Sequence, residues 1–222
     1  MADNLSDIYV GVNKKDPNRN KNDLYPTPPL ATFILQKYID LPETIVEPCA
    51  GRGNISIELT RNGYNVRSFD LYDYSDKLCP IITGKDVLTL EKQVGYNGLV
   101  TNPPYFKNLP EKILIKSLEH YDLTALFVRL TFLEGKRRHG IFSKNPPSDI
   151  LFFSDRVKLE SDAPEAINKN EQIGGMIAYM WIVFRRNHVG PTNLRWVLLE
   201  NEYDEWREHY ETTLDRLRDF RR

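Results

Sequence analysis

The sequence predicts an α/β fold with a mostly parallel, doubly wound sheet, and two observations lead to this prediction. Short apolar segments that are typical of buried strands, at 44–46, 98–100 and 123–130, alternate with segments of helical periodicity such as 110–121. A glycine-rich turn connects one of these strands to the helix that follows it. Strands that alternate with helices form parallel sheets with helices on both faces. The last strands of the chain indicate, in addition, a C-terminal antiparallel hairpin.

The composition excludes several classes of protein. The chain has 222 residues and a formal net charge of -1, a length that fits one α/β domain with at most a small appendage. No apolar run approaches the roughly 20 residues of a membrane-spanning helix, and the N-terminus lacks the pattern of a secretory signal peptide. Cys49 and Cys79 are too few for a metal cluster, and a disulfide framework is not expected. We therefore expect no metal, no membrane and a reducing, cytoplasmic setting.

Three regions differ in character along the chain. Residues 1–23 are polar, with basic side chains among Asn, Asp and Pro, and we expect a flexible basic arm. Residues 24–200 carry the alternating strands and helices of the main domain. Residues 201–222 form a charged, amphipathic segment, and we expect a C-terminal helix. This helix would pack through the following apolar residues or contact a partner: Trp206, Leu214 and Leu217.

The stretch Asn102-Pro103-Pro104-Tyr105 follows the apolar run 98–100 directly. The two prolines cannot continue a central strand, because each lacks the N–H that a sheet requires. These residues therefore lie at the carboxyl end of a strand, where open α/β sheets bind ligands. An amide oxygen, a proline carbonyl and a tyrosine ring suit a planar ligand ring with an exocyclic amine. The alternative is a strand-ending turn with a partly buried tyrosine.

A second candidate site follows the strand at 44–46. Glu47 to Asn54 form a turn with Gly51 and Gly53, and a helix follows. Glycines let the backbone approach a ligand closely. The acidic Glu47 would repel a pyrophosphate but favour a cationic amine or sulfonium. Asp70 ends the next strand, about 20 residues on, where a carboxylate accepts hydrogen bonds from ribose hydroxyls.

Two weaker signals remain open between a functional and a structural interpretation. Tyr25 and Thr27 lie in a proline-rich, extended segment before a helix that begins near Pro29, which is also typical of a simple turn and cap. Asp86 and Val87, after a short strand, could contact an adenine ring, or Asp86 could cap the next turn.

A basic segment lies between the apolar strands at 123–130 and 149–159. It contains Lys136, Arg137, Arg138 and Lys144, together with His139. We expect a loop here, because two glycines interrupt the pattern. The loop is either solvated surface or a phosphate-contacting loop beside the candidate site.

Taken in the order in which they occur along the chain, the motifs resemble those of S-adenosylmethionine-dependent N6-adenine DNA methyltransferases. The resemblance covers about residues 24–190. With the Tyr-x-Thr-Pro element first, the order is similar to the gamma arrangement. The blocks LEGKRR, PPSDILFF and AYMWIVF also resemble small methyltransferases of bacteriophages. The resemblance implies a Rossmann-like class I methyltransferase fold, S-adenosyl-L-methionine as the cofactor, and methyl transfer to the N6 amine of a flipped-out adenine. A Pro-Cys nucleophile serves cytosine C5 methyltransferases at a later position, so we exclude Cys49 as a nucleophile.

The resemblance also assigns roles to residues. In catalysis it implies Asn102, Pro103, Pro104 and Tyr105, with Tyr105 stacking on the base. For cofactor binding it implies Tyr25, Thr27, Pro28, Glu47, Pro48, Ala50, Gly51, Gly53, Asp70, Leu71, Asp86, Val87 and Asn102.

The sequence leaves alternatives to this function. The partner we expect is DNA, with RNA as an alternative, and we also consider a homodimer. Asn-Pro-Pro-Tyr also occurs in enzymes that methylate glutamine amides in proteins, and close variants occur in RNA adenine methyltransferases. A cofactor-binding regulator without turnover is the non-enzymatic alternative. If the chain is viral, its setting would be the host cytoplasm.

Overall fold

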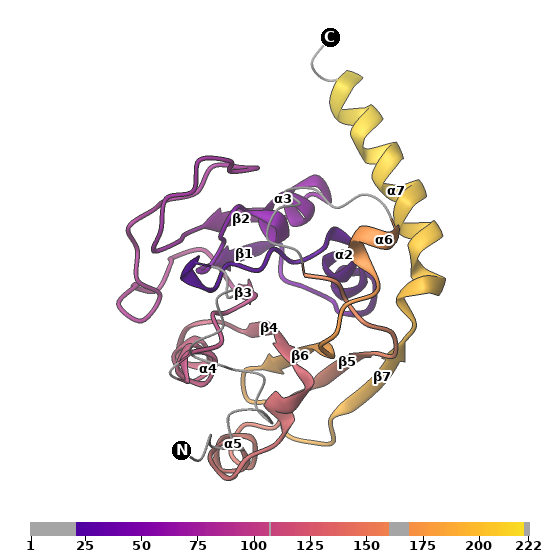
Figure 1. Cartoon of the computed structure of the whole chain (residues 1–222). Coiled ribbons are helices and arrows are strands. Elements are labelled where there is room, and N and C mark those ends of the chain that lie inside the picture. The colour runs from indigo at the N-terminus through magenta and orange to yellow at the C-terminus, as the bar shows by residue number, and fades with distance from the viewer. Residues whose placement is uncertain (1–20, 107, 160–168, 220–222) are drawn as a thin grey trace, which may run out of the picture.

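A seven-stranded sheet forms the centre of the molecule (Figure 1). The computed structural model describes residues 21–106, 108–159 and 169–219. The strand order in the sheet is β2-β1-β3-β4-β6-β5-β7. The strands are β1 (Thr44–Glu47), β2 (Asn65–Ser68), β3 (Gly98–Thr101), β4 (Leu123–Arg129), β5 (Asp149–Phe153), β6 (Tyr179–Arg185) and β7 (Asn193–Val197).

The direction of the strands confirms a mostly parallel sheet. β1 pairs in parallel with β2 and β3, and β3 pairs in parallel with β4. β6 runs antiparallel to both of its neighbours, β4 and β5. The predicted C-terminal antiparallel hairpin thus corresponds to β5 and β6, while β7 adds to β5 in parallel. Because β1, β2, β3 and β4 are parallel, their carboxyl ends meet at one edge of the sheet.

Helices cover both faces of the sheet (Figure 1). On one face lie α2, α3 and α7, and on the other lie α4 and α5. Side chains that alternate along the strands divide between two apolar clusters: Ile45 belongs to the first and Val46 to the second. The helices are α2 (Pro29–Tyr38), α3 (Asn54–Arg61), α4 (Leu109–His120), α5 (Lys136–Phe142), α6 (Lys169–Gln172) and α7 (Leu199–Asp219), with the 3-10 turns η1 (Lys21–Asp23) and η2 (Leu130–Leu133).

The N-terminal part of the domain is fixed to the sheet by α2. The helix begins at Pro29, as predicted, because proline suits the first helical turn and cannot continue a helix from before it. The indole N–H of the buried Trp181 on β6 donates to the Ala31 carbonyl oxygen at 2.7 Å. The proline-rich segment before α2 is thereby held beside the carboxyl edge of the sheet.

The structure corrects one of the predicted loops. The basic segment that we expected to be a loop contains α5 (Lys136–Phe142), because Gly135 has a φ of 106° and starts the helix before the basic residues. Gly140 lies inside this helix without ending it. Between β2 and β3, the predicted short strand is reduced to one isolated pairing of Ile82 with Phe69.

The C-terminal segment is helical, as expected, and α7 begins at Leu199. It packs against α2, where Lys37 forms ion pairs with Glu202, at 2.7 Å, and with Glu205. Trp206 is buried, as predicted. The side chains of Leu214 and Leu217 and residues 1–20 of the expected arm lie outside the described residues. No helix in the described ranges combines the length and the apolar character that crossing a membrane requires.

Candidate functional site

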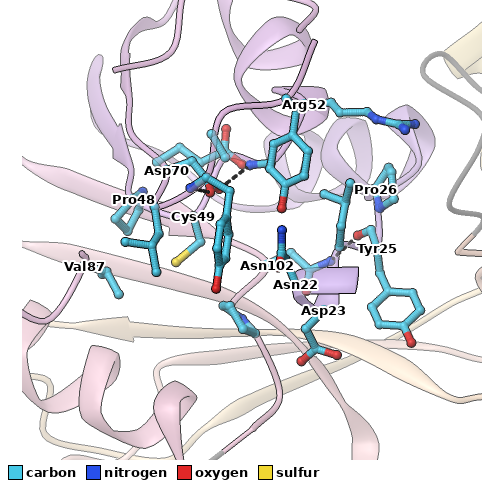
Figure 2. A pocket seen from close by; sticks show the side chains of 18 of the residues that line it. Asn22, Asp23, Tyr25, Pro26, Pro48, Cys49, Arg52, Asp70, Val87 and Asn102 are labelled. Atoms are coloured by element: carbon cyan, nitrogen blue, oxygen red, sulfur yellow. Dashed lines mark hydrogen bonds between the residues drawn. The ribbon is translucent and has the colours of Figure 1, made fainter. Parts of the chain in front are cut away.

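A pocket opens at the carboxyl edge of the parallel strands (Figure 2). It encloses about 820 Å³ of empty space, counted out to its open mouth. Glu47 ends β1, Asp70 follows β2 and Asn102 follows β3, so three adjacent strands each supply a polar side chain. The segment before α2, with Asp23 and Tyr25, forms the opposite wall.

The turn after β1 can form only with glycine at two positions. Gly51 has a φ of 58° and Gly53 a φ of 93°, which side chains rarely permit. A Cβ atom on Gly51 would lie 2.7 Å from Leu24 Cδ1, and one on Gly53 would lie 2.6 Å from Cys79 Sγ. Gly51 therefore brings bare backbone to the pocket wall, whereas Gly53 lies behind it and starts α3.

The carboxylate of Asp70 connects the ends of β1 and β2. Its Oδ2 accepts the backbone N–H of Gly51 at 2.7 Å, and its Oδ1 accepts the backbone N–H of Tyr72 at 2.8 Å. Burial raises the pKa of Asp70, and these two N–H donors oppose that rise. The backbone N–H of Leu71 also acts on this carboxylate. A carboxylate has about four acceptor positions, so it can still accept a hydrogen bond from a ligand hydroxyl.

Glu47 is a buried acid beneath the pocket. Its side chain is 1% exposed, and its Oε2 accepts the hydroxyl proton of Ser56. Burial raises the pKa of Glu47 to about 8, and the nearby Asp70 carboxylate adds to the rise. A buried acid of this kind favours a cationic group beside it, since the cation would restore the carboxylate to its ordinary ionisation.

Asn102 is held in one orientation by both ends of its carboxamide. Its Nδ2 donates to the Tyr25 carbonyl oxygen and to Thr27 Oγ1, each at 3.0 Å. Its Oδ1 accepts the hydroxyl proton of Tyr105 at 2.5 Å. These contacts place Tyr25 and Thr27 beside the Asn-Pro-Pro-Tyr stretch.

The rest of that stretch divides between the pocket and the core. Pro104 lines the pocket, as does Phe106, which is 38% exposed. Pro103 and Tyr105 do not line it. The Tyr105 ring is half-buried, and the Arg129 guanidinium lies 5.1 Å from its centroid. Stacking of Tyr105 on a substrate base stays a prediction.

The structure supports the capping interpretation of Asp86, and its contact with an adenine ring stays a prediction. Asp86 lines the pocket together with Val87. Its Oδ1 also accepts the backbone N–H of Leu88 at 2.8 Å, the capping contact of a turn.

Most of the predicted cofactor residues gather in this one pocket. Those that line it are Tyr25, Thr27, Glu47, Pro48, Ala50, Gly51, Asp70, Leu71, Asp86, Val87 and Asn102. Of the set, Pro28 lies outside because it caps α2, and Gly53 lies behind the turn.

Sequence reasoning missed several pocket residues. Those of most interest are Asn22, Asp23, Tyr72, Tyr74, Lys85 and Phe106. Tyr72 and Tyr74 follow Asp70 closely, and this proximity was the one signal in the sequence that could have indicated them. Asp23 was assigned to the arm, yet its Oδ2 accepts the backbone N–H of Tyr105 at 2.7 Å.

Cys49 lines the pocket, and its chemistry agrees with its exclusion as a nucleophile. Burial raises the pKa of this thiol above its ordinary value, and the Asp70 and Glu47 carboxylates raise it further. A thiol in such surroundings carries little thiolate, the reactive form.

The basic residues of α5 and of the segment after it differ in their environment. Lys136, Arg137 and Lys144 are exposed. Arg138 instead donates to the Thr131 carbonyl oxygen at 2.7 Å, lies 3.4 Å from the Glu111 carboxylate and covers the Phe132 ring at 5.2 Å. Arg138 thus fixes α5 against η2 and α4, and its guanidinium is less available to a ligand.

Comparison with solved structures identifies the fold. A Listeria monocytogenes protein described as a class I S-adenosylmethionine-dependent methyltransferase is similar with a TM-score of 0.56 at 11% identity, over 91% of this chain and 78% of that protein. An Agrobacterium tumefaciens protein described as an O-methyltransferase has a TM-score of 0.54 at 11% identity, over 82% and 97% of the two chains. The chain has the class I methyltransferase fold. At these identities the likeness establishes the fold alone, and it confirms the predicted fold class.

Two further similarities are to a Type II methyltransferase and to a modification subunit. The chain is 30% identical over 128 residues to Type II methyltransferase M.VspI of a Vibrio species (strain 343), covering 49% of this chain. It spans 31% of that relative's length. A modification subunit of a type I restriction enzyme from Vibrio vulnificus has a TM-score of 0.51 at 12% identity, over 94% of this chain and 56% of that one. No protein-family model matches the chain.

Proposed function

We propose that this chain binds S-adenosyl-L-methionine in the pocket and transfers its methyl group to the N6 amine of adenine in DNA. The observation that carries the proposal is the position of Asn102. Its side-chain oxygen is fixed by three hydrogen bonds around its amide, and the residue lines a pocket with the acidic Glu47 and Asp70.

The residues of the pocket fit this cofactor. The cofactor supplies an electrophilic methyl group on a sulfonium, and it carries a cationic amine, a ribose and an adenine ring. Glu47 favours a cation, and Asp70 has acceptor positions for hydroxyl groups. The bare backbone at Gly51 permits close approach, and Val87 offers an apolar contact to a ring.

For methyl transfer to adenine, the chain has to position the exocyclic amine and accept hydrogen bonds from it. The lone pair of an exocyclic amine on adenine is delocalised into the ring, which makes it a weak nucleophile. The Asn102 oxygen would accept an amine hydrogen and so favour the localised lone pair. Fixed acceptors of this kind act by electrostatic preorganisation and positioning. No covalent nucleophile is required.

Two observations favour DNA as the substrate. The sequence similarity is to a Type II methyltransferase, and a structural neighbour is a modification subunit of a restriction enzyme. Modification enzymes of restriction systems act on DNA. The exposed basic residues of α5 add side chains that can contact phosphates. The adenine would be extruded from its stack to reach the pocket.

The test is methyl transfer from labelled cofactor to unmethylated DNA, RNA and a protein extract in parallel, followed by nucleoside and amino-acid analysis. The proposal expects N6-methyladenine in DNA as the main product. If N6-methyladenine forms in RNA, or if methylated glutamine forms in protein, the proposed substrate class is wrong but the proposed cofactor is supported. Binding of cofactor without transfer to any of the three would indicate a regulator.

A further inference from the structure

The orientation of the Asn102 carboxamide is determined by its partners. The Tyr25 carbonyl can only accept a hydrogen bond, so the amide nitrogen must face it, at 3.0 Å. The second amide proton is directed to Thr27 Oγ1, also at 3.0 Å. Both donors are thus used, and the amide oxygen is left as the functional end of the side chain.

The Tyr105 hydroxyl occupies one of the two acceptor positions on that oxygen. It lies 2.5 Å from Asn102 Oδ1 and 3.1 Å from the Phe127 carbonyl oxygen. A hydroxyl has one proton, and the shorter distance assigns that proton to Asn102. One acceptor position on Oδ1 therefore remains for another donor.

The backbone and the ring of Tyr105 are both restrained. Its N–H donates to Asp23 Oδ2 at 2.7 Å, and its ring lies 5.1 Å from the Arg129 guanidinium and 6.2 Å from the Tyr179 ring. Burial, together with the neighbouring Tyr179, holds the pKa of Tyr105 well above its ordinary value. The hydroxyl therefore remains protonated, and able to donate, at any working pH.

We propose that Tyr105 is a positioning residue that acts through Asn102. Its hydroxyl holds the Asn102 oxygen so that a single acceptor position faces the substrate amine. This inference deepens the proposed function and rests on it. It differs from a stacking role for the ring, because stacking needs the ring but not the hydroxyl. Arg129 supports the positioning role by covering the ring while the hydroxyl contacts Asn102.

Tyr105→Phe separates the two roles, since it keeps the ring and removes the hydroxyl. Loss of one hydrogen bond that orients a reacting group is expected to lower kcat by roughly tenfold. KM for an adenine-containing oligonucleotide and the Kd of the cofactor should stay within about twofold, because neither ligand loses a contact. A kcat like that of the wild type would overturn the proposal.

A double-mutant cycle then tests whether Tyr105 acts through Asn102. In an Asn102→Ala background, Tyr105→Phe should cause no further loss of kcat, because the group it positions is absent. Equal fold-losses in both backgrounds would overturn the proposal. Tyr121→Phe is the matched control: it removes the hydroxyl of a buried tyrosine that follows α4, away from the pocket, and should leave kcat unchanged.

A measurement independent of turnover keeps this inference distinct from the proposed function. The ¹⁵N-labelled side-chain amide of Asn102, identified by its loss in Asn102→Ala, should exchange its protons with water faster in Tyr105→Phe than in the wild type, roughly tenfold. Unchanged exchange would overturn the positioning role. A different result would overturn the proposed function alone: the wild type does not methylate adenine, but exchange is faster in Tyr105→Phe. The hydrogen bond between Tyr105 and Asn102 would then still be supported.

Discussion

The Asp70 carboxylate accepts the backbone N–H of Gly51 at 2.7 Å, across the ends of two adjacent parallel strands. This bond fixes the glycine turn after β1 relative to the carboxyl end of β2. Both residues line the pocket, so the same contact that shapes the turn also orients an acceptor toward a ligand.

Removal of the Asp70 charge tests the cofactor site. Asp70→Asn retains the size of the side chain but weakens the acceptor for a ligand hydroxyl. Hydrogen bonds to charged groups contribute about 1.5–3 kcal/mol, so we expect the Kd of S-adenosylhomocysteine to rise at least tenfold by calorimetry. Asp73→Asn is the matched control, because Asp73 is exposed and contacts Lys77 on the surface. Equal effects of the two variants would exclude a specific role for Asp70.

The raised pKa of Glu47 predicts a pH dependence of stability. The folded protein binds a proton at Glu47 up to about pH 8, whereas the unfolded chain releases it near 4.5. The free energy of unfolding should therefore fall as the pH rises between these values, and this contribution should be constant above the higher one. Glu47→Gln should remove that part of the slope in denaturant titrations from pH 5 to 9. An unchanged slope in Glu47→Gln would contradict the assigned titration.

Gly53 and Gly63 have nearly equal φ values, so substitutions at them separate the cost of backbone strain from the cost of a crowded Cβ atom. Gly53 has a φ of 93° and Gly63 a φ of 90°, but only Gly53 has atoms where a Cβ would lie. Gly63→Ala should cost about 1–2 kcal/mol of stability, from the backbone angle alone. Gly53→Ala should cost at least about 1 kcal/mol more, because Cys79 Sγ would have to move. Equal losses in urea unfolding would show that the turn tolerates a Cβ.

The α5 helix predicts different effects for neighbouring basic residues. If Lys136 and Arg137 contact phosphates, replacing both by Gln should flatten the dependence of log affinity on log salt by about 0.9 per lost contact with duplex DNA. Arg138→Gln should instead lower the melting temperature, since Arg138 contacts Thr131 and Glu111. If the double change at Lys136 and Arg137 leaves the dependence of log affinity on log salt unaltered, these residues do not contact phosphates.

Local patterns in the sequence were sufficient to predict the mostly parallel sheet and the edge of the sheet at which the pocket opens. The prolines after β3, the glycines after β1 and the acid after β2 each mark the end of a strand, and parallel strands bring such ends together. The contacts of Asn102 with Tyr25 and Thr27 did not follow from these patterns, which left the segment before α2 open between a functional site and a simple turn.

What the sequence did not predict depends on contacts between distant residues. Asp23 was assigned to a flexible arm because its neighbours are polar, yet it accepts the N–H of Tyr105. The α5 helix was missed because two glycines interrupt the pattern of a short helix, which the ion pair of its Arg138 with Glu111 on α4 stabilises. The orientation of Tyr105 toward Asn102 depends on side-chain packing, which a linear pattern does not encode.

The most direct test of the proposed function compares wild type and Asn102→Ala for the rate at which N6-methyladenine forms in unmethylated DNA. The variant should retain the fold and the cofactor affinity but lose at least about a hundredfold in transfer, because a preorganised acceptor needed in the transition state is absent. Transfer by Asn102→Ala at a rate near that of the wild type would contradict the assignment of this site.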